Sequence, residues 1–201
     1  MGISFGGVMI TVILQIVKAS WAPPVRRIAE ANIAFIPYAL GGWLFTYMGR
    51  EHLFFWGHSE MPGREWWMQP NFVYLRFAIL FGILFWLLHR FVRTALRGDI
   101  GVARERGTNK NRWLGAFYDS LTKGWKGEHH EVAAIDYHRS YRAPILIMLY
   151  AVIYSLFAFE MIMGMDPKFY ANMFGGFVFI GNIYAGWAAL SLAVLFLRKQ
   201  N

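Results

Sequence analysis

The sequence predicts an all-α integral membrane protein with about five transmembrane helices in a bundle. Hydrophobic residues make up 57% of the 201 positions and charged residues only 16%, whereas about 25% of an average soluble domain is charged. The charges are separated by long apolar runs, and a spanning helix needs roughly 20 mostly apolar residues. A chain this short cannot bury five such stretches in one soluble core. These observations together favour a membrane bundle.

The expected helices follow the apolar runs of the chain. Their approximate ranges are 2–19, 31–49, 71–92, 143–164 and 170–197. They divide the chain into a first membrane part (1–93), a basic loop (94–142) and a second membrane part (143–201).

Local features support individual spans. The first segment starts directly in apolar sequence and lacks the basic region and cleavage site of a signal peptide, so we expect it to remain as a helix. Pro144 suits the first turn of the fourth helix, where its missing N–H costs nothing. Gly181 and Ala185 lie four residues apart in the fifth helix, which allows close packing on one face, either within the chain or between subunits.

Basic and non-basic connections alternate along the chain. The connection 18–30 has a net charge of +2 and the connection 50–70 a net charge of −1, while 90–142 holds eleven Lys and Arg against six Asp and Glu. Short loops rich in Lys and Arg stay in the cytoplasm. We therefore expect the N-terminus outside and the C-terminus inside, and we attribute the basic pI to topology rather than to nucleic-acid binding.

The basic loop 94–142 differs in character from the spans. Six glycines interrupt it, and we expect short amphipathic pieces such as 112–122 to lie along the membrane surface. Its basic excess would attract anionic lipid headgroups or an acidic partner subunit. Within it, Glu128, His129, His130 and Glu131 lack the spacing of a known metal site, so solvated charge is the better interpretation and no metal is expected.

Ionisable residues inside apolar spans are costly, which makes each one a functional candidate. Glu160 lies about one turn from the outer end of the fourth helix and is a candidate proton carrier, because loss of hydration disfavours a lone charged carboxylate. The alternative is an ordinary ion pair with an Arg or Lys, for example Lys168. Arg76 lies near the start of the third helix, where it either reaches outward or pairs with Glu160 or Glu51.

Further candidates lie near the outer membrane edge. Several aromatic residues there accompany a carboxylate and two histidines, Glu51, His52 and His58, which are candidates for a proton pathway or a quinone site. Histidine can relay protons or donate a hydrogen bond to a quinone carbonyl. The separation of the two histidines does not match the i, i+4 spacing that would place both on one helix face. Asp166 precedes Pro167, and we expect it either to cap the fifth helix or to belong to the same site.

Three charges open the second helix on the inner side. Arg26, Arg27 and Glu30 either orient the protein in the membrane or form an inner mouth for protons. The residues themselves do not decide between these two interpretations.

Four segments together resemble a known family. They are WAPPVRRIAEA (21–31), REHLFFW (50–56), PNFVYLR (70–76) and FEMIMGMDPKFYANMFGGFVFIGN (159–182). The chain is similar to the NrfD-like membrane subunits of the polysulfide-reductase family, and within it to the smaller such subunit of alternative complex III, a bacterial quinol:cytochrome c oxidoreductase. It departs from the family pattern in having Glu51 before His52, where the family commonly has a second histidine, and Glu160, where the family often has Asp.

This resemblance implies a place in a bacterial inner-membrane redox complex. The partner subunits would carry haem c and iron–sulfur clusters, since this chain offers no ligands for them, and the expected small-molecule cofactor is a quinone or quinol. The resemblance implies quinone binding, a proton pathway, or both; a purely structural membrane anchor is the alternative. Because such subunits usually have more than five helices, we expect the chain to be part of a larger helical subunit.

Overall fold

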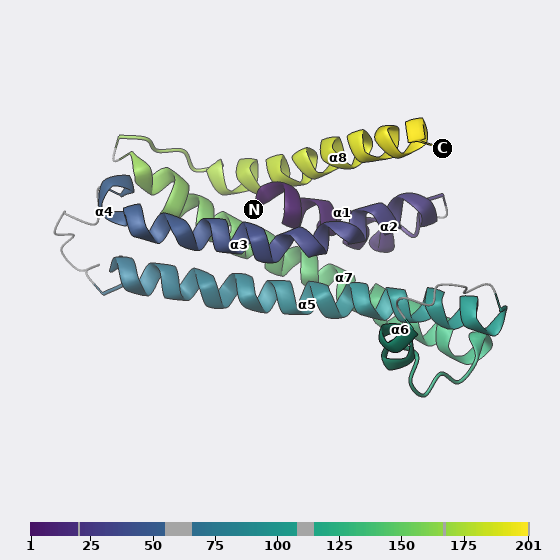
Figure 1. Cartoon of the computed structure of the whole chain (residues 1–201). Coiled ribbons are helices and arrows are strands. Elements are labelled where there is room, and N and C mark those ends of the chain that lie inside the picture. The colour runs from purple at the N-terminus through teal and green to yellow at the C-terminus, as the bar shows by residue number, and fades with distance from the viewer. Residues whose placement is uncertain (20, 55–65, 108–114, 167, 201) are drawn as a thin grey trace.

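The computed structural model of the chain is a bundle of long helices (Figure 1). It describes the chain except for residues 20, 55–65, 108–114, 167 and 201. The described part contains helices and turns but no strands. Four of its helical runs are long and apolar enough to cross a membrane. The prediction of an all-helical membrane bundle is confirmed.

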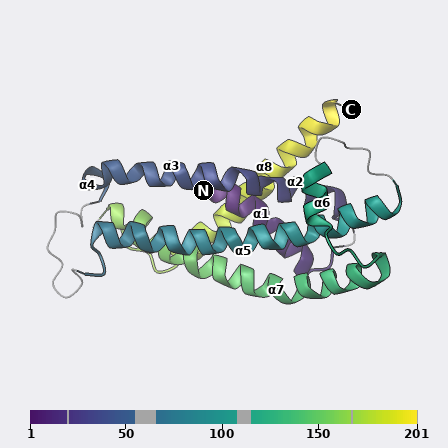
Figure 2. The same ribbon diagram turned by 60° about the horizontal axis from the view of Figure 1, so that its bottom comes forward.

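The long helical runs of the chain alternate in direction (Figures 1 and 2). The bounds are α1 (Gly2–Ile16), α2 (Pro23–Ala31), η1 (Asn32–Phe35), α3 (Ile36–Phe45), η2 (Thr46–Gly49), α4 (Arg50–Leu53), α5 (Pro70–Glu105), α6 (Gly115–Leu121), α7 (Glu128–Phe157), η4 (Ala158–Ile162), η5 (Met163–Met165) and α8 (Phe174–Gln200). The four candidate spans are Pro23–Leu53, Pro70–Glu105, Glu128–Met165 and Phe174–Lys199.

The first helix is shorter than the expected span 2–19. α1 has 15 residues and is therefore about 22 Å long, less than the roughly 30 Å of a bilayer core. It starts partway along the bundle and runs toward the start of α2 (Figure 1). Phe5, Val8 and Met9 are fully buried, because α7 and α8 pack against this helix. α1 thus forms part of the bundle's core.

Glycine sets the contact between α1 and α8, but at a different position from the expected one. A Cβ on Gly186 would lie 2.6 Å from the carbonyl carbon of Gly6, so only glycine lets the two backbones approach this closely. Gly181, in contrast, has no atom within 4 Å of its Cβ position. Gly186, rather than Gly181, therefore allows the close contact within the chain.

The prediction of a glycine-broken loop over 94–142 is wrong, because α5 continues to Glu105 and α7 already begins at Glu128. Gly101 does not interrupt α5. A Cβ there would lie 2.5 Å from Cε3 of Trp125, so this glycine makes room for a packed indole. Three other glycines do mark breaks in the helices, since they have positive φ: Gly107, Gly124 and Gly127. The described part of the expected amphipathic piece 112–122 is α6.

Pro144 does not open a helix as expected. It lies in the interior of α7, which begins 16 residues earlier. A proline there removes one backbone hydrogen bond, and membrane helices tolerate this where neighbouring helices support them. The extensive packing of α7 on α5 supplies that support.

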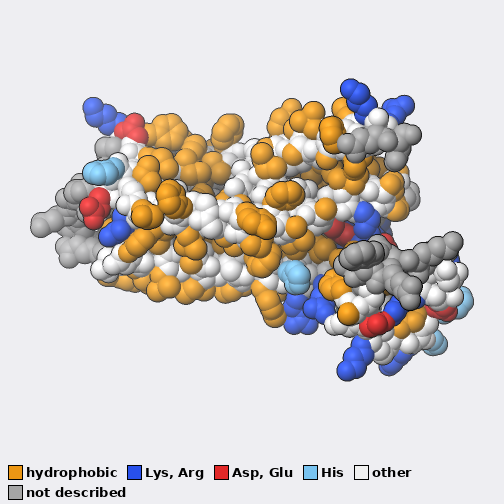
Figure 3. Space-filling view, in the orientation of Figure 1, with side chains coloured by type: hydrophobic (Ala, Val, Ile, Leu, Met, Phe, Trp, Pro, Cys, Tyr) orange, Lys and Arg blue, Asp and Glu red, His pale blue; other side chains and the backbone are white. Residues whose placement is uncertain are grey.

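The bundle has two distinct ends, which we name after short helices. The α4 end holds α4 and the start of α5, and the α6 end holds α6 and the C-terminus of α8 (Figure 1). Hydrophobic side chains cover the middle of the molecule between them, and charged side chains gather toward the ends (Figure 3). This distribution is typical of a protein embedded in a membrane.

Candidate functional site

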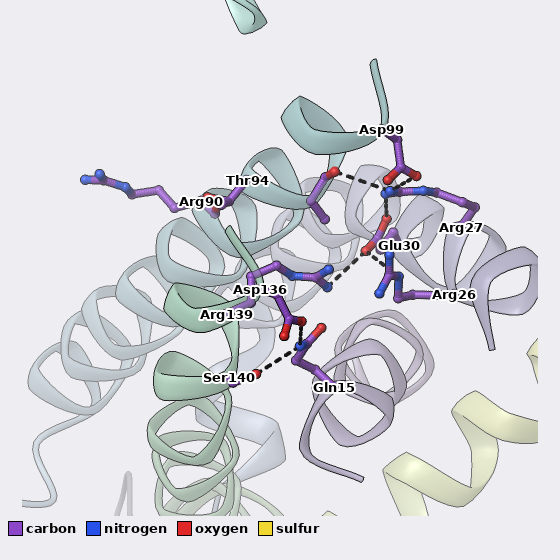
Figure 4. A network of polar contacts seen from close by, with 11 residues as sticks. Gln15, Arg26, Arg27, Glu30, Arg90, Thr94, Asp99, Asp136, Arg139 and Ser140 are labelled. Atoms are coloured by element: carbon purple, nitrogen blue, oxygen red, sulfur yellow. Dashed lines mark hydrogen bonds and ion pairs between the residues drawn. The ribbon is translucent and has the colours of Figure 1, made fainter. Parts of the chain in front are cut away.

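Charged residues of α2 form the centre of a buried network at the α6 end (Figure 4). Arg26 and Arg27 precede Glu30 by four and three residues, spacings that bring both side chains next to Glu30 on the helix surface. Arg27 donates a hydrogen bond to Glu30, and Nε of Arg26 lies 3.8 Å from the same carboxylate. The Glu30 side chain is only 3% exposed. The three residues that the sequence placed at the start of a span therefore do come together.

The network extends to α7 and α5. Arg139 of α7 has an exposed fraction of 5%, and its guanidinium lies 3.5 Å from Glu30 and 4.6 Å from the ring of Phe91. Arg27 pairs with Asp99 of α5 and donates a second hydrogen bond to the Ala95 carbonyl at 3.3 Å. Three arginines thus surround one buried carboxylate.

A second set of contacts ties α1 to α7 beside the network. The amide nitrogen of Gln15 donates to Oδ1 of Asp136 at 2.7 Å and to the Ser140 hydroxyl at 3.1 Å. Figure 4 shows these bonds next to the arginines around Glu30. Four helices therefore contribute polar side chains to one region of the α6 end.

A cavity of about 470 Å³ adjoins this network. Its lining includes Arg26 and Arg139 together with Asp99 and Asp136. Two buried guanidinium nitrogens, Nε of Arg26 and Nε of Arg139, have no hydrogen-bond partner among the described residues. Because unpartnered buried donors are costly, water in this cavity is the simplest partner for them.

A smaller charged site lies at the α4 end. Arg76 of α5 pairs with Glu160, and each of these side chains is 11% exposed. The indole N–H of Trp67 donates to Oε1 of Glu160 at 3.0 Å, and the Arg76 guanidinium lies 4.1 Å from the Trp67 ring centre. The pairing of Arg76 with Glu160 was one of the two alternatives that the sequence offered for Arg76. Lys168 is not the partner.

The backbone around Glu160 is irregular. α7 passes into the π-helical turn η4, which contains Glu160, and then into the 3₁₀ turn η5. π-helical turns are rare and often occur at functional sites. The turn allows Glu160 to reach Arg76 on the neighbouring helix.

The other predicted site residues stand apart from this pair. His52 and Glu51 are exposed on α4, and Glu51 lies 3.7 Å from Arg50. His58 lies outside the described residues. Asp166 is exposed and accepts a hydrogen bond from the Lys168 backbone at 2.9 Å, so the expected cap is wrong: α8 begins only at Phe174. These residues share the α4 end with Arg76 and Glu160 without joining their ion pair.

Several residues of the network were not predicted from the sequence. Asp99, Asp136 and Arg139 fall in the segment interpreted as a loop, and Gln15 falls in a segment interpreted as apolar. The signal was present in the spacing of Asp136, Arg139 and Ser140, which share a face if the segment is helical. Their partners on other helices could not be inferred from spacing.

Between the two ends, hydroxyl groups are buried in the apolar core. The Thr11 and Tyr154 hydroxyls have no hydrogen-bond partner among the described residues. Tyr154 packs against Phe81 and Phe157, with ring centroids 5.4 and 6.2 Å away. Buried polar groups of this kind commonly bind internal water.

The fold and these sites define a helical membrane protein with an ion-pair site at each end of its bundle. No protein-family model matches the chain, and no curated protein and no solved structure matches it.

Proposed function

We propose that the chain is a membrane subunit of a bacterial quinol:cytochrome c oxidoreductase of the alternative complex III type, and that it handles protons and a quinone headgroup at the α4 end. The observation that carries this proposal is the ion pair of Arg76 and Glu160. It lies in apolar helices where isolated charges are costly and are therefore usually functional. The resemblance to NrfD-like subunits supports the same conclusion, since Glu160 falls within its longest matching segment.

The chemistry of the pair suits proton transfer. A carboxylate can accept and release a proton, while the guanidinium stays charged at all physiological pH values. A change in protonation of Glu160 would leave Arg76 without its counter-ion but still over the Trp67 ring, where cation–π attraction partly stabilises it.

The surroundings of the pair favour a flat apolar ligand. Trp66, Trp67 and Phe72 form an aromatic group in which each pair of ring centroids is 5.4–6.0 Å apart. Aromatic faces stack well on a quinone ring, and Arg76 beside them can donate to a quinone carbonyl.

The proposed orientation follows the charge distribution. The α6 end carries the basic excess, and the positive-inside rule assigns such an end to the cytoplasm. The C-terminus would then be inside and the α4 end would face outward. In this orientation the buried Glu30 lies toward the cytoplasmic side, where protons would enter, and Glu160 lies toward the side of release.

The first test is isolation of the chain from its native membrane in mild detergent. Haem c and iron–sulfur subunits should accompany it, and absorption spectra and subunit mass would detect them. A chain that is isolated alone, with no redox-active partner, contradicts membership of the complex.

The second test addresses the site in the isolated complex. Glu160→Gln should lower quinol:cytochrome c reductase activity and proton release by tenfold or more, whereas Glu160→Asp should retain part of both, since a carboxyl group remains. Glu51→Gln is the matched control, because Glu51 is 68% exposed and outside the pair. If Glu160→Gln and the control variant both equal the unmodified complex, the site has no role in the reaction.

A structural anchor is the second candidate, and Gly181 favours it. The Cβ position of Gly181 is open, so this glycine serves no contact within the described chain and would allow a partner helix to approach closely. On this hypothesis Gly181→Leu releases the partner subunits, while Glu160→Gln has no effect.

A further inference from the structure

A groove between α5 and α7 at the α6 end is apolar at one end and cationic at the other. An apolar cavity of about 300 Å³ is lined by Trp86, Leu87, Arg90, Arg142, Ile145 and Leu146. A polar cavity of about 710 Å³ continues from it toward the α6 end, and Arg90 and Arg142 line both. These two arginines therefore mark the boundary between the apolar and the polar part.

The boundary coincides with the edge of the apolar span. Residues 77–88 of α5 carry no charge, and Arg90 follows this stretch. From the start of the helix at Pro70 to Arg90, α5 is about 30 Å long. That length matches the hydrocarbon core of a bilayer. On α7, Arg142 lies 18 residues from Glu160 at the other end, a distance of about 27 Å. Arg90 and Arg142 are thus at headgroup depth.

Three arginines of this region have no acidic partner among the described residues: Arg90, Arg93 and Arg142 form no ion pair there. The Arg90 guanidinium lies 5.0 Å from the centre of the Trp86 ring. Glu131 is the single acidic residue among the described residues that line the polar cavity, and Arg97 already binds it through two hydrogen bonds of 2.8 and 2.9 Å. Figure 4 shows Arg90 pointing away from the network around Glu30.

Basic side chains also line a third cavity, which has a volume of about 460 Å³. Its lining includes His89, Arg90, Arg93 and Arg97, and the part of the lining that the structure describes has no acidic residue. Helical spacing explains the cluster, because positions 86, 90, 93 and 97 of α5 recur on one face. Arg142 and Ile145 likewise lie three apart on α7.

We propose that this groove binds an anionic phospholipid. The phosphate group lies between Arg90 and Arg142, with Arg93 close by, and an acyl chain follows the apolar cavity along Trp86, Leu87 and Ile145. Basic pockets between transmembrane helices on the cytoplasmic side bind anionic headgroups in this way. The apolar cavity joined to the basic one favours a lipid over an acidic protein, which would need only the basic part.

The proposal is tested on the full chain purified in detergent, by native mass spectrometry with added phosphatidylglycerol or phosphatidylcholine. Phosphatidylglycerol should bind the unmodified chain at least tenfold more tightly. Arg90→Gln combined with Arg142→Gln should lower its affinity roughly tenfold or more. The matched control combines Arg198→Gln with Lys199→Gln, which removes the same charge at the end of α8 and should leave the affinity unchanged. Equal binding of the two lipids, or equal losses in both double variants, overturns the proposal.

A third variant separates a lipid from a simple phosphate ion. Ile145→Trp fills the apolar cavity at a residue that is exposed in the chain, so the fold should tolerate it. It should weaken phosphatidylglycerol binding severalfold, and 10 mM inorganic phosphate should displace little of the lipid.

Full displacement by inorganic phosphate, with no effect of Ile145→Trp, would show an anion site without lipid specificity. Unchanged lipid binding together with loss of copurifying subunits in the Arg90 and Arg142 variant would instead show a protein-docking surface. Either result contradicts the lipid site.

Discussion

The two ends of the bundle both bury ion pairs, but they do so in different ways. At the α4 end, Arg76 and Glu160 form one pair between α5 and the end of α7, with Trp67 against both. At the α6 end, Glu30 is approached by arginines from two helices, and the network extends to Asp99. One end has a pair, and the other has a network spread over several helices.

The difference indicates which charges contribute most to holding the helices together. Removing one member of the network leaves deeply buried partners unpaired on other helices, which is costly. Removing one member of the pair affects two side chains close to the membrane edge. The network at the α6 end is therefore the structural tie, and loss of the pair at the α4 end should cost the fold less.

The largest effect is expected from Glu30→Gln. Arg139 would lose its carboxylate partner while only 5% exposed, and breaking a buried pair in this way costs about 3–5 kcal/mol. Unfolding by sodium dodecyl sulfate in mixed micelles, followed by circular dichroism, would measure the loss. Glu51→Gln serves as a control with no expected change. A loss for Glu30→Gln below about 1 kcal/mol would contradict the role of the network as a tie.

A second variant tests whether the extension of α5 is a packed part of the fold. Gly101→Leu would drive a side chain into the Trp125 ring, and overpacking of this kind costs about 1–3 kcal/mol. Gly82→Leu in the same helix has no neighbour within 4 Å of its Cβ and should be neutral or stabilising in the same assay. Equal stability of the two variants would mean that the α6 end is not tightly packed.

Arg76→Gln should destabilise the chain less than Glu30→Gln. Its partner Glu160 keeps the hydrogen bond from the Trp67 indole, and we expect a loss of about 1–2 kcal/mol. The same micelle titration measures it. A loss as large as that of Glu30→Gln would remove the distinction between the two ends.

The smallest effect is expected from Asp99→Asn, at the rim of the network. Asp99 is 55% exposed, although it pairs with Arg27, and exposed pairs contribute about 0–1 kcal/mol. Thermal unfolding in detergent, monitored beside Glu30→Gln, would rank the two positions. A larger loss of stability for Asp99→Asn than for Glu30→Gln would show that the exposed pair of Arg27 and Asp99 stabilises the fold more than the buried contacts of Glu30 do.

The sequence marks the charged residues of the site at the α4 end more clearly than those of the network at the α6 end. Glu160 and Arg76 are isolated charges in apolar runs, so composition alone singles them out. Arg139 and Asp99 lie in a polar, glycine-containing segment, where charges are ordinary. Gly101 shows why that segment was misinterpreted: a glycine that would break an isolated helix is favourable where Trp125 packs against it.

The membrane class follows from the amino-acid sequence alone, because apolar runs and their length depend only on local composition. The same runs indicate which charges are costly. Three features emerge only from the packed helices: α1 is a short buried helix, Glu30 meets Arg139 at 3.5 Å, and Arg90 and Arg142 line one groove. These contacts join residues far apart in the chain, and side chains on different helices meet only where the packing of whole helices brings them together.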